Sequence, residues 1–402
     1  MRTIKVGIIG TGFIGPAHVE ALRRLGSVEV VGLAESNAGL AEQKAKLLGI
    51  QQAYGDYKDL LKDSRIEAIH NCTPNFVHFK INKDVIAAGK HLVSEKPLAM
   101  NSKESAELMR LAKKAGVLNG INFNYRFYPL IQHARALIAD KKAGDVRLVH
   151  GSYLQDWLLF DTDYNWRLEP AVGGKSRAVA DIGSHWCDLI QHVTGLKIIE
   201  VMADLSTVIP VRKKPKTVIE TFAGKALKPS DYDHIKIATE DYASVLFRFD
   251  NGARGVFTVS QVSPGRKNRL YFEIDGAYHS IVWDQEKPEE MWMGYRDRPN
   301  ELLVKDPSLL HPQAKPYAHY PGGHPEGYPD GPKNFFRNFY QWVAEGKVPA
   351  KGEPDFATFE DGHCAILICE AILKSAKQKK WVKVQARQSK PQRHRGTETI
   401  RL

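Results

Sequence analysis

Cysteine is scarce in this 402-residue sequence, which contains only four and no C-x-x-C pair. Disulfide-stapled domains and zinc ribbons depend on closely spaced cysteine pairs, so neither class is indicated. The four cysteines fall in predicted strands and helices, where reduced and buried thiols are expected. They are Cys72, Cys187, Cys364 and Cys369.

Long apolar runs are also absent, since no stretch approaches the roughly 18 residues of a membrane span. The chain begins Met-Arg-Thr-Ile-Lys and passes directly into a strand pattern, without the apolar segment and cleavage site of a secretory signal. We therefore expect a cytoplasmic protein that does not interact with membranes.

A concentrated basic surface is missing as well, although the formal net charge is +11. Lysine and arginine are dispersed along the chain, and the one local excess lies in residues 385–402, with five basic residues and one acidic residue. Nucleic-acid recognition would need basic residues gathered on a reading element, so no nucleic-acid partner is expected. The basic tail is predicted to be disordered.

The length favours two domains, because single cores stop growing beyond roughly 250–300 residues. Residues 1–125 alternate short β-branched runs with helical periods, which predicts an α/β Rossmann domain with a parallel sheet and helices on both faces. The predicted strands are Ile4–Ile9, Val28–Ala34, Ala68–Cys72, His91–Ser94 and Val117–Asn122. The predicted helices are Pro16–Leu25, Asn37–Leu48, Phe76–Ala88 and Lys103–Ala115.

Residues 126–384 follow a different pattern, in which successive strands are joined by tight turns such as Asp250–Gly252 and Asp275–Ala277. This predicts an α+β domain with an open, mainly antiparallel sheet, whose C-terminal helices pack back on the Rossmann domain. The predicted strands are Arg147–Leu154, Ala243–Phe249, Ala253–Ser260, Arg269–Asp275 and Tyr278–Trp283. Helices are predicted over 130–140, 180–193, 334–343 and 358–376, with a Gly/Pro-rich loop over 311–332 that is long enough to be functional.

The motif G-T-G-F-I-G follows the first predicted strand and opens a helix, as in dinucleotide-binding folds. Gly10 would make the tight turn, Gly12 would admit the pyrophosphate, and Gly15 would let the helix pack on the strand. The second strand ends in Glu35, whose carboxylate would bind the ribose hydroxyls of NAD and repel the extra phosphate of NADP. The cofactor is therefore predicted to be NAD, with NADP less favoured. The alternative is that Glu35 only caps the next helix.

Two further strand ends would face the same crevice, because ligands lie at the carboxyl ends of parallel strands. Thr73-Pro74-Asn75 follows one strand, and Glu95-Lys96-Pro97 follows the next. Lys96 would place a cation near the nicotinamide ribose and the reacting hydroxyl.

Three motifs of the sequence resemble those of the glucose-fructose oxidoreductase and inositol dehydrogenase (Gfo/Idh/MocA) family. The motifs are GTGFIG, EKP and DIGSHWCD, and the resemblance extends to about Val384. The stretches FNYRFYP, YLQDW, NWRLEP and GHPEGYPDGPKNFF resemble the branch of sugar dehydrogenases that contains levoglucosan dehydrogenase. The resemblance implies a homodimer or homotetramer formed through the open sheet.

The chemistry also follows from the residues of the helix predicted over 180–193. Asp181, His185, Asp188 and His192 recur on one helical face, while Ile182 and Leu189 lie on another. Oxidation of a secondary alcohol needs a base near the nicotinamide, and histidine is suited to this by its pKa. Asp181 would steady that imidazole or bind substrate, and Lys96 would stabilise the alkoxide.

The resemblance carries the same roles to Lys96, Asp181 and His185, the predicted catalytic residues. Asp188 and His192 are expected to be structural. The predicted cofactor-binding residues are Gly10, Thr11, Gly12, Phe13, Ile14, Gly15, Glu35, Thr73, Pro74, Asn75, His78, Glu95, Lys96, Asn124 and Arg167. The predicted substrate-binding residues are Lys96, Tyr125, Arg126, Tyr153, Gln155, Trp157, Trp166, Asp181, His185 and His324. The segment GGHPEGYPDG is predicted to form a polar rim or lid over the substrate.

These observations predict an NAD-dependent dehydrogenase that oxidises a secondary hydroxyl of a sugar, glycoside, anhydrosugar or cyclitol to a ketone. Two alternatives share the fold: a glycosidase that uses transient oxidation by NAD, and a regulator that binds a dinucleotide without turnover. A metal site at Asp181 and His185 is a third possibility, which the NAD pattern makes unnecessary, so no metal is expected.

Overall fold

A six-stranded parallel sheet occupies the first third of the chain in the computed structural model, which describes residues 2–216, 231–347 and 354–384. Its strand order is β3-β2-β1-β4-β5-β6, the order of a dinucleotide-binding Rossmann sheet. The strands are β1 (Ile4–Ile9), β2 (Val28–Ala34), β3 (Gln52–Tyr54), β4 (Ala68–Asn71), β5 (His91–Ser94) and β6 (Asn119–Ile121). The helices are α1 (Ile14–Arg23), α2 (Ala38–Leu48), α3 (Tyr57–Lys62), α4 (Asn75–Ala87) and α5 (Ser102–Ala115). The predicted Rossmann domain is confirmed, with β3 and α3 as elements the sequence pattern missed.

A nine-stranded mixed sheet forms the second domain, and its order is β16-β15-β14-β13-β7-β12-β11-β8-β17. Every pairing in it is antiparallel except β7 with β12, so the prediction of a mainly antiparallel sheet is confirmed. The strands are β7 (Leu148–Leu154), β8 (Ile198–Ser206), β11 (Tyr242–Phe249), β12 (Arg254–Ser260), β13 (Arg269–Asp275), β14 (Ser280–Asp284), β15 (Glu290–Gly294), β16 (Glu301–Val304) and β17 (Val382–Lys383). A separate hairpin joins β9 (Val211–Pro215) to β10 (Tyr232–Lys236).

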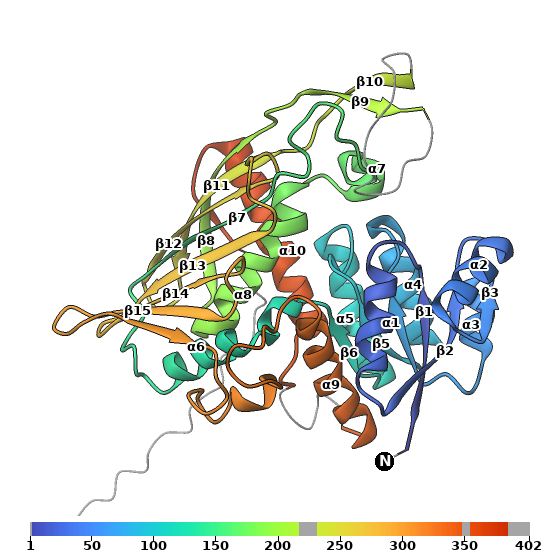
Figure 1. Ribbon diagram of the computed structural model, residues 1–402. Coiled ribbons are helices and arrows are strands. Elements are labelled where there is room, and N and C mark those ends of the chain that lie inside the picture. The colour runs from blue at the N-terminus through green and yellow to red at the C-terminus, as the bar shows by residue number, and fades with distance from the viewer. Residues whose placement is uncertain (1, 217–230, 348–353, 385–402) are drawn as a thin grey trace, which may run out of the picture.

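One face of the large sheet is covered by helices, and these lie between it and the Rossmann domain (Figure 1). Trp186 on this face stacks on Phe247 and Phe257 of the sheet, with ring centroids 5.7 and 4.9 Å away. The helices of this part of the chain are α6 (Pro129–Ala139), α7 (Pro170–Gly173), α8 (Ser184–Thr194), α9 (Asp330–Ala344) and α10 (Phe359–Gln378). Helix α9 packs on α1, and α10 contacts both α5 and β8, so the two C-terminal helices join the domains.

The segment predicted as one helix over 180–193 is two kinds of helix in sequence. A π-helical turn, η3 (Val179–Gly183), leads directly into α8. A π-turn shifts the helical repeat by one residue, and such turns are frequent at functional sites. It therefore changes how Asp181 lies relative to His185 on α8.

None of the described helices is long and apolar enough to cross a membrane. The four cysteines are unpaired thiols, of which Cys72 and Cys187 are buried and Cys364 and Cys369 are half-buried. The basic tail, residues 385–402, lies outside the described residues.

Candidate active site

The glycine turn after β1 has the conformation that the dinucleotide motif requires. Gly10 has φ +85°, and a Cβ there would lie 3.0 Å from the carbonyl carbon and oxygen of Cys72, so a larger residue is excluded on both counts. A Cβ on Gly15 would lie 2.4 Å from the Gly10 oxygen, while one on Gly12 would meet nothing within 4 Å. Gly12 therefore leaves open space beside the N-terminus of α1, where a pyrophosphate would accept hydrogen bonds from backbone N–H groups.

Glu35 closes this crevice at the carboxyl end of β2. One of its oxygens, Oε1, accepts hydrogen bonds from the backbone N and the hydroxyl of Thr11, at 2.5 and 2.6 Å. Among residues 2–216, 231–347 and 354–384, the other oxygen, Oε2, receives only a long bond of 3.3 Å, from the N–H of Ser36. The carboxylate is thus held in place with one oxygen available to ribose hydroxyls. The cap of α2 is made instead by the Asn37 side chain, which accepts from Leu40 N.

Replacing Glu35 by alanine is expected to weaken NAD binding about tenfold to a hundredfold, because a charge-assisted hydrogen bond contributes roughly 1.5–3 kcal/mol. NADP binding should weaken less, because the same change removes a charge that repels its extra phosphate. The dissociation constants of both cofactors would be measured by fluorescence titration. Glu29→Ala, which removes an exposed carboxylate at the other end of β2, is the control. An unchanged preference would contradict the ribose assignment.

The side chains of Lys96 and Asp181 meet between the two domains. Lys96 Nζ lies 2.9 Å from Asp181 Oδ1 and donates a second bond, of 2.7 Å, to the backbone oxygen of Asp181. Arg167 Nε lies 3.3 Å from the same Oδ1, and Gln261 Nε2 donates to Oδ2 at 2.9 Å. Burial would raise the pKa of the Asp181 carboxyl, but the charges of Lys96 and Arg167 hold it well below its usual range. The carboxylate is therefore ionised and surrounded by donors.

His185 lies among aromatic rings, one turn along the same helical segment. Its ring centroid is 5.6 Å from that of Phe123, 5.1 Å from Tyr125 and 6.4 Å from Tyr153. Burial, and then the charge of Lys96, lower the pKa of His185 to about 3, so the imidazole is neutral at physiological pH. Its Nδ1 is buried and has no hydrogen-bond partner among the described residues. An unpaired buried nitrogen of this kind fits a group that meets a ligand.

A polar network extends from these rings along β7. Tyr125 and Tyr153 share a hydroxyl–hydroxyl bond of 2.7 Å, and both also bond to Asn268, at 2.9 and 2.8 Å. Gln155 Nε2 donates to Asn268 Oδ1 at 2.7 Å, and Trp157 Nε1 donates to Gln155 Oε1 at 2.8 Å. Four of the predicted substrate-binding side chains therefore form one wall. Sequence reasoning missed Asn268, which is a residue of the loop before β13.

The Glu95 carboxylate turns the other way, into the Rossmann domain. Its Oε1 accepts from His18 Nε2 at 2.9 Å and from Asn122, and His18 Nδ1 lies 2.9 Å from His70 Nδ1. His70 Nε2 lies 2.6 Å from the Tyr340 hydroxyl on α9. Burial would raise the pKa of Glu95, but the hydrogen bonds from His18 and Asn122 lower it to about 2. Because this carboxylate only accepts, His18 Nε2 donates to it, and with neutral imidazoles the other bonds run from Tyr340 through His70 to His18.

Three of the predicted site residues either bind other protein groups or are exposed to solvent. Both ring nitrogens of His78 lie 2.7 Å from the backbone oxygens of Pro97 and Thr73, so this side chain joins two strand ends. Arg126 is buried in ion pairs with Asp188 and Asp361. His324 is exposed, and its Nδ1 lies 3.3 Å from the oxygen of Gly322.

The loop predicted as a polar rim reaches this site through a different residue, Tyr328. Its ring centroid lies 6.4 Å from that of Tyr125. Glu326 in the same loop is almost fully buried and pairs with Lys305 at 2.9 Å, so the loop is anchored by an internal charge pair. Glu326 is thus a buried residue of this polar segment, and the rim or lid over the substrate stays a prediction.

The remaining predicted residues of the cofactor crevice lie around these groups. Asn75 Nδ2 donates to the oxygen of Gly173 in α7 at 2.9 Å, and the Arg167 guanidinium stacks on Trp166 at 4.3 Å. The buried Nδ2 of Asn124 has no partner among the described residues, which suits a side chain that would bind a ligand. The donors, the open space at Gly12 and the Glu35 oxygen therefore fit a bound NAD.

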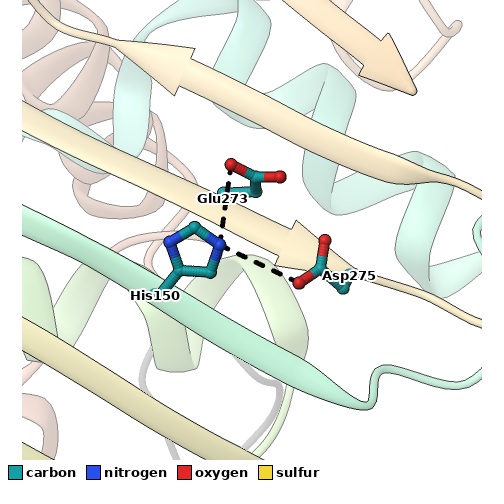
Figure 2. A group of neighbouring side chains, drawn as sticks. All are labelled: His150, Glu273 and Asp275. Atoms are coloured by element: carbon teal, nitrogen blue, oxygen red, sulfur yellow. Dashed lines mark ion pairs between the residues drawn. The ribbon is translucent and has the colours of Figure 1, made fainter.

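Two other features of the described residues lie near this site or behind it. A cavity of about 430 Å³ is lined by Lys96 together with residues of α7 and α10, and its mostly apolar lining includes neither Asp181 nor His185. Figure 2 shows His150 between Glu273 and Asp275, with nitrogen–oxygen distances of 3.5 and 3.9 Å. This group of three residues could ligate a metal. Along β7, however, His150 alternates with Gly151 and Tyr153, and the Gly151 position faces Trp186 of α8, so the His150 side chain lies on the opposite face of the sheet.

Stability should fall as the pH drops below about 6.5, because several histidines are buried as neutral imidazoles. Burial lowers the pKa of His133 to about 4, and burial with the charge of Lys96 lowers that of His185 to about 3. The unfolded chain binds these protons at the ordinary pKa and the folded protein does not, so acid favours unfolding. Each such histidine contributes up to about 1.4 kcal/mol per pH unit between about pH 6.5 and its folded pKa.

Urea midpoints at about pH 7, 6 and 5 measure this dependence. His133→Gln keeps an acceptor for the backbone N–H of His311, which donates to His133 Nδ1 at 2.8 Å. In this variant the free energy of unfolding should change less steeply with pH, by the contribution of up to one bound proton. The same slope in both proteins would mean that His133 is not buried in its neutral form.

Comparison with known proteins agrees with this arrangement. Residues 4–123 match a family model described as an oxidoreductase family with an NAD-binding Rossmann fold, and residues 131–282 match the GFO/IDH/MocA C-terminal domain. Levoglucosan dehydrogenase of Pseudarthrobacter phenanthrenivorans is 29% identical over 96% of this chain and 99% of its own length. The solved structure of levoglucosan dehydrogenase with NADH and levoglucosan has a TM-score of 0.85 at 28% identity, covering 96% of this chain and 100% of that chain. An inositol dehydrogenase homologue with NAD+ from Azotobacter vinelandii has a TM-score of 0.82 at 25% identity, covering 95% and 97%.

The Rossmann sheet, the glycine turn and the group around Lys96 define an NAD-dependent dehydrogenase. The chain belongs to the Gfo/Idh/MocA family of oxidoreductases, and the resemblance of its motifs to that family is confirmed.

Proposed function

We propose that this protein oxidises a secondary hydroxyl of a sugar, glycoside, anhydrosugar or cyclitol to a ketone, with NAD as the hydride acceptor. The observation that carries the proposal is the contact of Lys96 with Asp181 between the domains, beside a neutral and buried His185. Levoglucosan dehydrogenase and the inositol dehydrogenase homologue support sugars and cyclitols as the class of substrate.

Each residue of the site has a separate role in the oxidation of the alcohol. Bound NAD would supply the hydride acceptor, held by the glycine turn, Glu35 and Asn124. His185 accepts the hydroxyl proton, since its imidazole is unprotonated across the neutral range; burial and the charge of Lys96 lower its pKa to about 3, below the near-neutral value expected from the sequence. Lys96 stabilises the oxygen as negative charge develops on it, and Asp181 keeps the ammonium oriented.

The wall formed by Tyr125, Tyr153, Asn268, Gln155 and Trp157 supports a polyhydroxylated substrate. It combines hydroxyl and amide groups, which hydrogen-bond to sugar hydroxyls, with aromatic faces, which pack on sugar C–H groups. Trp166 and the Arg167 stacked on it would close the opposite side.

We also propose a cytoplasmic homodimer or homotetramer that associates through the open face of the large sheet. Leu246, Leu302 and Val304 of this sheet are 48%, 58% and 50% exposed, and these apolar side chains would be covered in such an assembly. Sedimentation of the purified protein tests the assembly.

The catalytic proposal is tested with purified protein, NAD and a panel of sugars, anhydrosugars, glycosides and cyclitols. NADH absorbance should rise with at least one substrate class and should scale with the amount of enzyme. Cleavage of a glycoside without net NADH would contradict the proposal and support transient oxidation. Binding of NADH with no turnover on any substrate would support a regulator.

A further inference from the structure

Behind Asp181, on the side away from Lys96, lies a buried polar chain that the sequence motifs do not contain. Gln261 follows β12 and is fully buried. Its Nε2 donates to Asp181 Oδ2 at 2.9 Å, and its Oε1 accepts from Arg177 Nη1 at 3.0 Å. A flipped amide would place an oxygen against the carboxylate and an N–H group against the guanidinium, so one orientation is strongly preferred.

Arg177 is itself fixed from the other side. Its Nη2 pairs with Asp241, and its Nε donates to the hydroxyl of Thr239 at 3.2 Å. Asp241 is fully buried and also accepts from Arg212 Nη2 and from the backbone N of Ile209, both at 2.9 Å. A guanidinium bonded at three nitrogens to buried partners has little freedom to turn.

The backbone that carries Asp181 is held by the same short segment of chain. Glu240 Oε1 accepts from the backbone N of Arg177 at 2.9 Å and of Val179 at 3.0 Å, at the start of the π-turn. Thr239, Glu240 and Asp241 therefore fix both the turn and the side chains behind Asp181.

We infer that Gln261, held by Arg177 and Asp241, is a positioning residue that sets the orientation of the Asp181 carboxylate. Occupying Oδ2 leaves Oδ1 directed at Lys96 and Arg167, and Lys96 in turn is directed at the reacting hydroxyl. This inference rests on the proposed function, because it assigns the purpose of that orientation. Gln261 acts through Asp181 and does not touch the reacting atoms.

Gln261→Met keeps the length of the side chain and removes both hydrogen bonds. We expect kcat to fall about tenfold to a hundredfold, since small misplacements of catalytic groups have effects of this size. The KM for the sugar and the affinity for NADH should stay within about threefold, because Gln261 contacts neither. Gln132→Met, which removes another buried glutamine away from Asp181, is the matched control and should keep kcat within about twofold.

Gln261→Glu gives a readout that a purely structural role would not move. One oxygen of the introduced carboxylate would meet the Arg177 guanidinium, and the other would face Asp181 at hydrogen-bond distance, so ionisation of both acids still carries a repulsion at Asp181. Its kcat should therefore fall further as the pH rises from about 5 to about 8, relative to the wild-type protein at each pH. A parallel pH profile for wild type and Gln261→Glu would overturn the inference, as would a kcat of Gln261→Met within about twofold of wild type.

The rate at which Lys96 reacts with trinitrobenzenesulfonate, followed by mass spectrometry, separates this inference from the proposed function. The reagent attacks the uncharged amine, and an oriented carboxylate favours the ammonium, so loss of that orientation should raise the rate at least about threefold in Gln261→Met and leave it unchanged in Gln132→Met. If wild-type protein oxidises no substrate, the proposed function fails while this measurement still decides whether Gln261 positions Asp181. An equal rate in both variants would overturn the positioning role.

Discussion

Lys96→Met should lower kcat by about a hundredfold to a thousandfold, the range found when one donor to a developing oxyanion is removed. The ammonium donates to Asp181 in the structure and would face the hydroxyl that loses its proton. Methionine keeps the length of the side chain and cannot carry a charge. The pair is mostly shielded from solvent, with the side chains of Lys96 and Asp181 14% and 15% exposed, so water cannot fully replace the lost charge.

The measurement is the initial rate of NADH formation on the best substrate of the panel, with NADH affinity measured separately by titration. Lys96 is also a predicted cofactor contact, so NADH affinity should fall, but much less than kcat, which places the main loss in the chemical step. Lys83→Met, at an exposed lysine of α4 that pairs with Glu107, is the control and should leave kcat unchanged. If Lys96→Met kept more than about a third of the wild-type kcat, the proposed role of the ammonium would be wrong.

Arg126→Met should destabilise the protein by about 3–5 kcal/mol, because it removes the cation from a buried ion pair. Arg126 Nε donates to Asp188 Oδ2 at 2.8 Å, its Nη2 also pairs with Asp188, and a further bond of 2.9 Å joins Nη2 to Asp361. Asp188 is 4% exposed, so its carboxylate would lose its charged partner without gaining water.

Urea unfolding measures this loss, and the double variant Arg126→Met, Asp188→Leu should recover a large part of it, because no charge is then left unpaired. In the folded fraction, the KM for the sugar should stay near the wild-type value, since the Arg126 guanidinium is occupied by two carboxylates. A large rise in KM with unchanged stability would restore Arg126 as a substrate-binding residue.

Much of the Rossmann domain could be predicted from the sequence, because its signals are local. β1 and β2 begin and end at the predicted residues, and β5 does so as well. β3 and α3 were missed because three and six residues are too few to show a period. β9 was missed for another reason. Its Arg-Lys-Lys run is typical of a solvated loop, and it forms a strand because it pairs with β10.

The site divides in the same way. Lys96, Asp181 and His185 could be found because short motifs carry them, and Glu35 could be found because its place follows from the strand that precedes it. Asn268 and Gln261 had no motif, since each is an ordinary amide that acquires its role from partners more than 75 residues away in sequence. Arg126 lies within a stretch that resembles sugar dehydrogenases, but the nearest carboxylates, not a substrate, hold its guanidinium.

The sequence by itself determined the main strands and helices of the Rossmann domain, the glycine turn and the kinds of side chain available for hydride transfer, because these depend on spacing and residue type. Only the tertiary structure decided which of those side chains meet. The Lys96–Asp181 contact and the Gln261–Arg177 chain join strand ends, a π-turn and loops from both domains. The Lys96–Asp181 contact arises where one domain docks on the other, and the Gln261–Arg177 chain arises from the folding of the second domain, so neither has a periodic pattern in the sequence.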